Sequence, residues 1–152
     1  HIQDYFQTII SQAKTFSNDW MIVDSCEQFK KNFFQAAEGI DQDRIINMRR
    51  ELGLNFSGSD YLQNPTFNQY NELVPGYHHR PVDTYIPADN NAVVLQYFYI
   101  YKNPNPVGEK HNLNSADANL AYNEVHKKYH PVIRDFLDTF HYYDIFIIDP
   151  DT

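Results

Sequence analysis

Apolar residues recur at steps of four and three positions through the first part of the chain. Such steps place side chains on one stripe of an α-helix, and the stripe consists of Ile2, Phe6, Ile9, Ala13, Phe16, Trp20 and Val23. It continues through residues 26–33 and predicts one long N-terminal helix with a bend. Residues 17–19 leave open a second helix that begins near Trp20, because serine, asparagine and aspartate side chains accept hydrogen bonds from free backbone N–H groups.

The apolar stripe has two interpretations. The helix packs against the rest of its own domain, or it forms a parallel dimer with the same helix of a second copy. The stripe spans about three heptads, too few to separate the two by pattern alone. We favour packing within the chain and keep a homodimer open.

Glycine and proline divide the middle of the chain. Gly39 ends the first helical pattern, and Asp41 is suited to cap the helix that follows. Residues 55–91 carry several prolines and glycines, which interrupt regular structure, although residues 67–73 fit a short helix. We therefore expect a helical N-terminal part over residues 1–54, followed by a loop-rich connection.

Residues 92–101 have the pattern of a strand. β-Branched and aromatic residues dominate, and turn-forming residues bound the segment on both sides. In that conformation Tyr97 and Tyr99 would share one face of a sheet. The Asn-Pro-Asn-Pro run that follows cannot continue a strand ladder, since prolines lack N–H donors, and it predicts a rigid loop.

A helix and a second strand are expected after this loop. Ser115 is suited to cap the helix. The helical phase continues for several turns, so Pro131 either kinks one helix or begins another. Residues 142–149 contain a short apolar run typical of a buried strand. Residues 92–152 thus form the mixed strand-helix-strand part of one single region that spans residues 1–152.

Composition adds an aromatic character and an acidic charge. The chain has 12 tyrosines and 11 phenylalanines, so the core and any pocket are expected to be aromatic. It carries 12 basic against 20 acidic side chains, a net charge of −8. This excess argues against nucleic acid as a partner, because phosphate binding requires clustered basic residues. The single Cys26 cannot form a disulfide within the chain.

Two basic groups near the rigid loop and an arginine on the last helix are candidates for a ligand site. Lys110 and His111 follow the loop, where they can face an anionic ligand, and Arg134 offers a planar fork to the same group. The tyrosines that can line such a pocket are Tyr97, Tyr99 and Tyr122. The alternatives are a salt bridge from Arg134 to a nearby aspartate and plain packing for the tyrosines.

His126 and His130 stand four residues apart, which places both imidazoles on one face of a continuous helix. We include His126 among the ligand-binding residues. No glutamate follows it, so the metalloprotease signature is absent. A metal site is not expected, because structural metal sites want about four ligands and few others are near. The alternative role for both histidines is hydrogen bonding that ties the helix to a loop.

The signatures of common enzymes are missing from the sequence. It contains no G-x-S-x-G elbow, P-loop, dinucleotide fingerprint or C-x-x-C-H haem attachment. Acidic pairs such as Asp41 and Asp43 are more often solvated or capping than catalytic. We therefore expect neither catalysis nor a cofactor.

Residues 93–149 carry a series of motifs: LQ-x-x-YI, NPNPVG, H-x-x-YHP-x-x-R and YYDIFIIDP. They resemble the sensor regions that lie outside the membrane in bacterial transmembrane receptors, including methyl-accepting chemotaxis proteins, histidine kinases and nucleotide cyclases. Such regions are similar to Cache domains, which are relatives of the PAS fold. One departure is His141, because the family usually has a glycine before the paired tyrosines.

This resemblance implies an α+β fold, in which a long N-terminal helix leads into a small sheet with flanking helices. It also implies further strands after residue 151, so that the sheet is incomplete at the C-terminus of this chain. The intact protein would be anchored in the inner membrane, with this part in the periplasm. Binding of a small ligand would then pass a conformational change to a cytoplasmic output domain in signal transduction.

From these patterns and the resemblance we expect an extracytoplasmic signal-sensing domain that binds a small molecule, with an anion as the first guess. Two alternatives stay open. The chain can be a structural or dimerisation module of a receptor without any small-molecule ligand, or a metal-binding protein.

Overall fold

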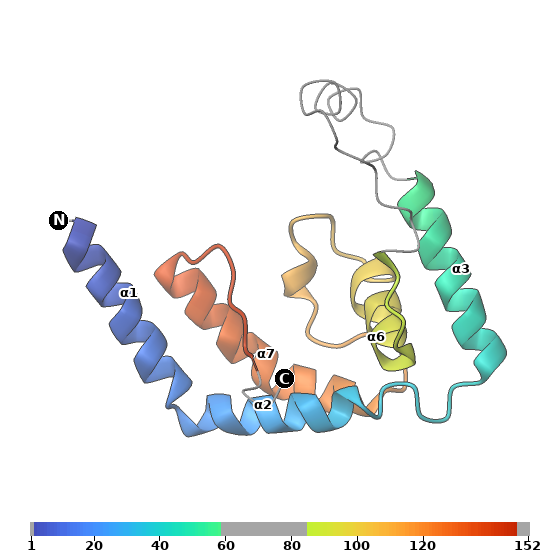
Figure 1. The fold of residues 1–152 in the computed structure, drawn as a ribbon, viewed down its shortest axis with the longest axis horizontal. Helices are drawn as coiled ribbons and strands as arrows, with labels where there is room; N and C mark the ends of the chain where they lie inside the picture. Colours follow the sequence, from blue (N-terminus) through green and yellow to red (C-terminus); the bar gives the residue numbers. More distant parts are fainter. Residues whose placement is uncertain (1, 59–84, 149–152) are drawn as a thin grey trace. The chain divides into compact units, whose positions relative to one another are not determined.

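The computed structural model describes residues 2–58 and 85–148 of the chain, and in these residues it is helical (Figure 1). No strand occurs among the described residues. The predicted α+β fold with a PAS/Cache-like sheet is therefore wrong. Within the same residues, none of the helices combines the length and apolarity needed to cross a bilayer.

Two compact units make up the chain. Unit 1 comprises His1–Gln35 together with Asn119–Thr152, and unit 2 comprises Ala36–Ala118. Unit 2 is thus inserted in the sequence between the two segments of unit 1. The expected helix at residues 67–73 lies outside the described residues.

Unit 1 begins with two helices, α1 (Ile2–Ser17) and α2 (Trp20–Phe33). The carboxylate of Asp19 accepts a 2.8 Å hydrogen bond from the backbone N–H of Met21, which caps α2. The amide of Asn18 donates to the carbonyl of Lys14 at 2.7 Å at the end of α1. The capped break is therefore confirmed, and the single long helix is wrong.

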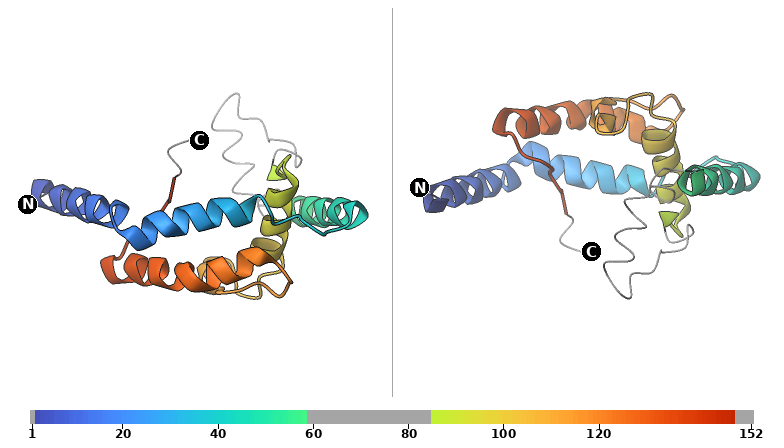
Figure 2. Two further views of the ribbon diagram at one scale, coloured as in Figure 1. Left: turned by 90° about the horizontal axis from the view of Figure 1, so that it is seen from below. Right: turned by 90° about the horizontal axis from the view of Figure 1, so that it is seen from above.

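The last helix of unit 1, α7 (Ala121–Phe140), packs along α2 (Figures 1 and 2). It begins after Leu120, so the expected cap at Ser115 is wrong. Pro131 lies inside α7, which excludes a new helix starting there. Figure 1 shows that α7 changes direction along its length, as expected where a proline ring crowds the carbonyl of residue 127 and cannot donate. The core residues shared with α2 are Ile22, Ser25, Val125 and Tyr129.

A left-handed residue ends α7 and reverses the chain. His141 has φ 56°, and the N–H of Tyr142 donates to the carbonyl of Leu137 at 3.0 Å. Residues 142–148 then run back without regular structure (Figure 1). The strand expected at residues 142–149 is wrong for the part described, because a strand requires a partner ladder and none is present among these residues.

Unit 2 is built on α3 (Gln42–Gly58), against which α6 (Asn90–Leu95) and the π-helix η2 (Gln96–Tyr101) pack. A short 3-10 helix, η3 (Lys110–Asn112), follows the proline loop. The strand expected at residues 92–101 is wrong, since this stretch is α6 and η2. The buried residues of this stretch recur with helical spacing and are Val93, Val94, Tyr97 and Phe98. The buried residues of α3 are Ile45, Met48 and Leu52.

Candidate functional site

The seven residues predicted to bind a ligand fall in different units. Unit 2 holds Tyr97, Tyr99, Lys110 and His111. Unit 1 holds Tyr122, His126 and Arg134. Neither unit alone brings the whole set together.

In unit 2, the hydroxyl of Tyr97 is engaged in a polar cluster. It donates to Glu51 at 2.9 Å, and the ammonium of Lys102 lies 3.1 Å from the same carboxylate. The hydrogen bond from Lys102, and then that from Tyr97, hold the pKa of Glu51 below its usual value. Burial, followed by the hydrogen bond to Glu51, raises the pKa of Tyr97. The polar end of Tyr97 therefore joins η2 to α3.

The proline loop is organised around Asn103, which is 5% exposed. Its amide donates to the carbonyls of Tyr99 and Lys110, both at 2.9 Å, and its side-chain oxygen accepts from the N–H of Asn105 at 3.0 Å. The ammonium of Lys110 donates to the carbonyl of Asn103 at 2.7 Å. Lys110 thus closes the loop, and His111 is exposed beside it. The paired Asn-Pro steps are the sequence signal for Asn103, since asparagine side chains build such turns.

In unit 1, the imidazoles of His126 and His130 stack, with ring centroids 4.2 Å apart and an angle of 22° between the planes. Phe29 of α2 meets His126 edge-on at 6.2 Å, and Tyr122 lies 6.0 Å from it. Burial raises the pKa of Tyr122 to about 12, so its hydroxyl stays neutral. The helical spacing therefore places both histidines together, as predicted.

No metal centre accompanies this pair in the part of the chain that the structure describes. Groups of three or more histidine, cysteine or acidic side chains able to hold a metal ion do not occur among those residues. The two imidazoles also present their faces to each other, whereas metal ligation uses the nitrogen at the ring edge. The arrangement fits an aromatic wall better than a chelate.

Two adjacent cavities open between the helices of unit 1, with volumes of about 870 Å³ and 500 Å³. Both have Cys26, Lys30, Ile145 and Ile147 in their walls, so they adjoin each other at α2 and the returning segment. We call the two cavities together the α2–α7 trough. The volume of each cavity falls in the range of small-molecule sites.

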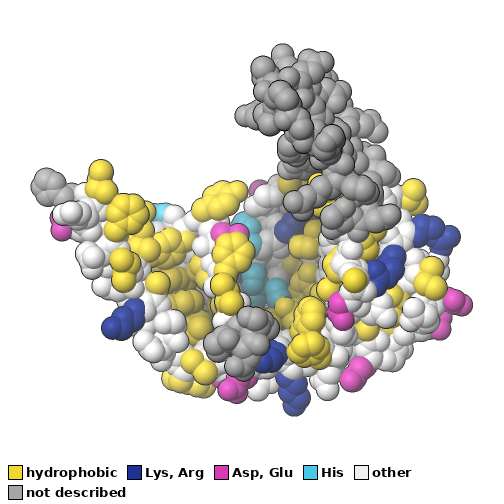
Figure 3. Space-filling view, in the orientation of Figure 1, with side chains coloured by type: hydrophobic (Ala, Val, Ile, Leu, Met, Phe, Trp, Pro, Cys, Tyr) yellow, Lys and Arg dark blue, Asp and Glu magenta, His cyan; other side chains and the backbone are white. Residues whose placement is uncertain are grey.

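The larger cavity is mainly apolar. It is walled by residues of α1, α2, α7 and segment 142–148, including Ile9, Ala13, Phe16, Ile22, Val23 and Phe136. Phe16 and Phe136 stack in this wall with centroids 4.0 Å apart. Apolar side chains are visible over α1 and the end of α7 in Figure 3. This end of the trough offers a hydrophobic surface to a bound molecule.

The smaller cavity holds the histidine pair. Its walls include Tyr122, His126, His130 and Lys30, together with Phe29, Phe33 and Ile133. Arg134 lines neither cavity. The sequence shows the histidine pair, but it does not show that Lys30 and segment 142–148 come to the same place, because those contacts join parts far apart in the chain.

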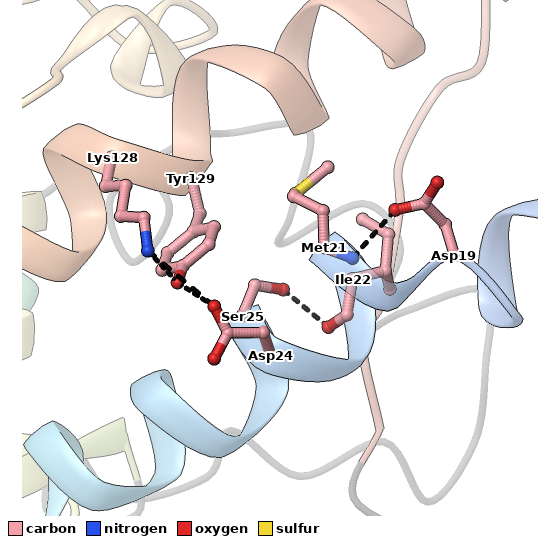
Figure 4. A network of polar contacts seen from close by, with 7 residues as sticks. All are labelled: Asp19, Met21, Ile22, Asp24, Ser25, Lys128 and Tyr129. Atoms are coloured by element: carbon pink, nitrogen blue, oxygen red, sulfur yellow. Dashed lines mark hydrogen bonds and ion pairs between the residues drawn. The ribbon is translucent and has the colours of Figure 1, made fainter.

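A polar network joins α7 to α2 (Figure 4). The hydroxyl of Tyr129 donates to the carboxylate of Asp24, and Lys128 lies 3.6 Å from that carboxylate. The hydrogen bond from Tyr129 is the main cause that holds the pKa of Asp24 below its usual value, and the charge of Lys128 adds to it. The ammonium of Lys128 also donates a hydrogen bond to the hydroxyl of Tyr129, and this contact, followed by the charge of Asp24, raises the pKa of Lys128.

No protein-family model, curated protein or solved structure matches the chain.

Proposed function

We propose that this chain is the ligand-sensing part of a bacterial transmembrane signalling receptor, located in the periplasm, with the intact protein anchored in the inner membrane. One observation carries the proposal. The two motifs in H-x-x-YHP-x-x-R and YYDIFIIDP, which carry the resemblance to receptor sensor regions, line one cavity through His126, His130, Ile145 and Ile147. The motifs are thereby linked to a place where a small molecule can bind.

Binding in the trough would act on the packing of unit 1. The walls come from α1, α2, α7 and the returning segment, so a bound molecule would contact three helices and the C-terminal segment of unit 1. A ligand can shift such an equilibrium only as far as its affinities for the two arrangements differ. The signal would pass from these helices to the cytoplasmic output domain of the receptor.

A ligand screen tests this function. The chain is heated with amino acids, carboxylates and divalent metal ions, and a specific ligand of the folded state raises the unfolding midpoint. We expect a hit whose effect disappears when Ile145 or Ile147, which face the trough, is replaced by aspartate. The matched control is Tyr143→Asp, because Tyr143 belongs to the same segment, is fully exposed and lines neither cavity. A hit that is insensitive to the trough variants places binding elsewhere and contradicts the proposal.

A second candidate is a dimerisation module without a small-molecule ligand. The observation that favours it is α1, which has no buried residue and exposes Ile2, Phe6 and Ile10. Sedimentation of the chain over a wide concentration range distinguishes the candidates. A dimer that forms through α1, combined with a screen that yields no ligand, would favour this module over a sensor.

A further inference from the structure

We infer that the α2–α7 trough takes an amphipathic monocarboxylate, a molecule with one carboxylate and an apolar body. Its carboxylate would lie beside Lys30, His126 and His130, and its body would extend along the larger cavity. This inference rests on the proposed function and names the ligand class of the same site. The structure supports it through the charges and surfaces of the two cavities.

The smaller cavity favours an anion. Lys30 is the one formally charged side chain in its described wall, and no aspartate or glutamate lines it. The imidazoles of His126 and His130 add N–H groups that can donate to a carboxylate. Hydrogen bonds in which one partner is charged are about twice as strong as neutral ones. A ligand ammonium at this place would meet Lys30 and would find no carboxylate to accept its protons.

The larger cavity favours an apolar body and disfavours a second carboxylate. Its walls are mostly aliphatic and aromatic, and the Phe16–Phe136 stack forms part of them. Glu27 and Asp144 also line it, and both would repel an acidic group at the far end of the ligand. A dicarboxylate or a sugar therefore fits less well than a fatty or aryl acid.

The affinity should depend on both the length of the apolar body and the charge of the head group. Each methylene group that enters the larger cavity is expected to tighten binding roughly fourfold. Butyrate, hexanoate and octanoate form a series that measures this increment by calorimetric titration of the full chain, with 4-phenylbutyrate as an aryl acid. The matched controls are octylamine, octanol and octanedioate, which change the charge or add a second acid. We expect each control to bind at least tenfold more weakly than octanoate.

Cys26 provides an independent report on where the ligand lies. It is the single cysteine of the sequence and lines both cavities. Octanoate in the trough should slow the reaction of this thiol with a disulfide reagent at ligand concentrations that match the calorimetric Kd. Binding without protection of Cys26 would place the ligand outside the trough and would overturn the inference.

Charge variants test the position of the carboxylate. Lys30→Ala should weaken octanoate at least tenfold, whereas Lys30→Arg should keep binding within about threefold because the positive charge remains. Lys31→Ala is the matched control, since Lys31 is the next residue, is exposed and lines neither cavity. His126→Asn should also weaken the binding of octanoate, while His111→Asn in unit 2 should leave that binding unchanged.

The outcomes separate this inference from the proposed function. If octylamine or octanol binds as tightly as octanoate, or if Lys30→Ala binds octanoate unchanged, the monocarboxylate assignment is wrong. An amino acid or metal ion that protects Cys26 when the fatty acids do not would overturn the inference and leave the sensor function standing. If no compound of the screen protects Cys26, the trough is not a sensing site, and both the proposed function and the monocarboxylate inference are wrong.

Discussion

The hydroxyl of Tyr129 on α7 donates a hydrogen bond to the carboxylate of Asp24 on α2 (Figure 4). Tyr129 is 2% exposed, and its ring lies 6.1 Å from that of Phe29. The acceptor Asp24 is partly exposed, so the contact itself is part-buried. Ring and hydroxyl together hold the two helices that form the walls of the trough. The contact also joins residues from opposite ends of the chain, whose association defines unit 1.

Tyr129→Phe should destabilise unit 1 by about 1 kcal/mol, because the ring remains while the hydrogen bond is lost. Urea unfolding followed by circular dichroism measures the change. Lys127→Ala is the control, since Lys127 is an exposed lysine of the same helix, whereas Lys128 donates a hydrogen bond to the Tyr129 hydroxyl and its removal would perturb the contact under test. The free energy cost of Asp24→Asn should be smaller in the Tyr129→Phe background than in the wild type. If the cost is the same in both backgrounds, the two residues do not act as a pair.

Acid should weaken unit 1 through Asp24. Its pKa in the folded chain lies below the ordinary value of 3.8, mainly because Tyr129 donates to it. The unfolded state therefore binds the proton first as the pH falls. This contribution to stability is present above pH 3.8 and is lost as the pH falls further, through the folded pKa. Denaturant midpoints measured from pH 6 to pH 3 should decline less for Asp24→Asn than for the wild type, and parallel profiles would contradict the assignment.

His141→Gly should stabilise the end of α7. A non-glycine residue in the left-handed conformation costs roughly 1–2 kcal/mol, and His141 has φ 56°. Because glycine loses more backbone entropy on folding, we expect a net gain of about 0.5–1 kcal/mol, seen as a higher thermal midpoint. Thr139→Gly, two residues earlier within α7, is the control and should lower the midpoint. A lower midpoint for His141→Gly would show that the imidazole contributes more than the backbone conformation costs.

Self-association through α1 predicts a clear mutational pattern. Phe6→Lys and Ile10→Lys should weaken a dimer without lowering stability, because both side chains are more than half exposed. Gln3→Lys is the control on an exposed polar position of the same helix. Sedimentation equilibrium of each variant measures the effect. Phe16 is not suitable for this test, since it stacks on Phe136 inside unit 1. A wild-type chain that stays monomeric at all concentrations would contradict the prediction.

Features set by local chemistry could be predicted from the sequence. Asp19 caps α2 through a backbone group only two residues away, so the pattern of side chains alone locates the break. His126 and His130 share a helix face because their spacing matches one turn. Their common cavity with Lys30 and Ile145 depends instead on how α7, α2 and the returning segment pack, which no local pattern shows.

The fold class could not be read from strand propensity. Residues 92–101 are β-branched and aromatic, yet Val93, Val94 and Tyr97 bury themselves against α3 in a helical conformation. Burial against a neighbouring element outweighs intrinsic preference, which spans only about 1 kcal/mol for strands. One helical signal was present, because Asp89 stands three residues before Ala92 and accepts its N–H at 2.9 Å.

The π-helix η2 constrains how many residues can separate Tyr97 from Lys102. Residues five apart would point about 140° away from each other on an α-helix, but the wider turn of a π-helix brings them to nearly the same side. The N–H of Lys102 donates to the carbonyl of Tyr97 at 2.8 Å, and both side chains reach Glu51. If the same residues formed an ordinary α-helix without the wider turn, Tyr97 and Lys102 would diverge and Glu51 could keep only one of its two partners. Deleting one residue between them would instead leave them four apart, which places both on one face of an ordinary α-helix. A one-residue gap in this stretch of a related chain is therefore compatible with a glutamate at the position of Glu51, whereas a one-residue insertion should coincide with a change there.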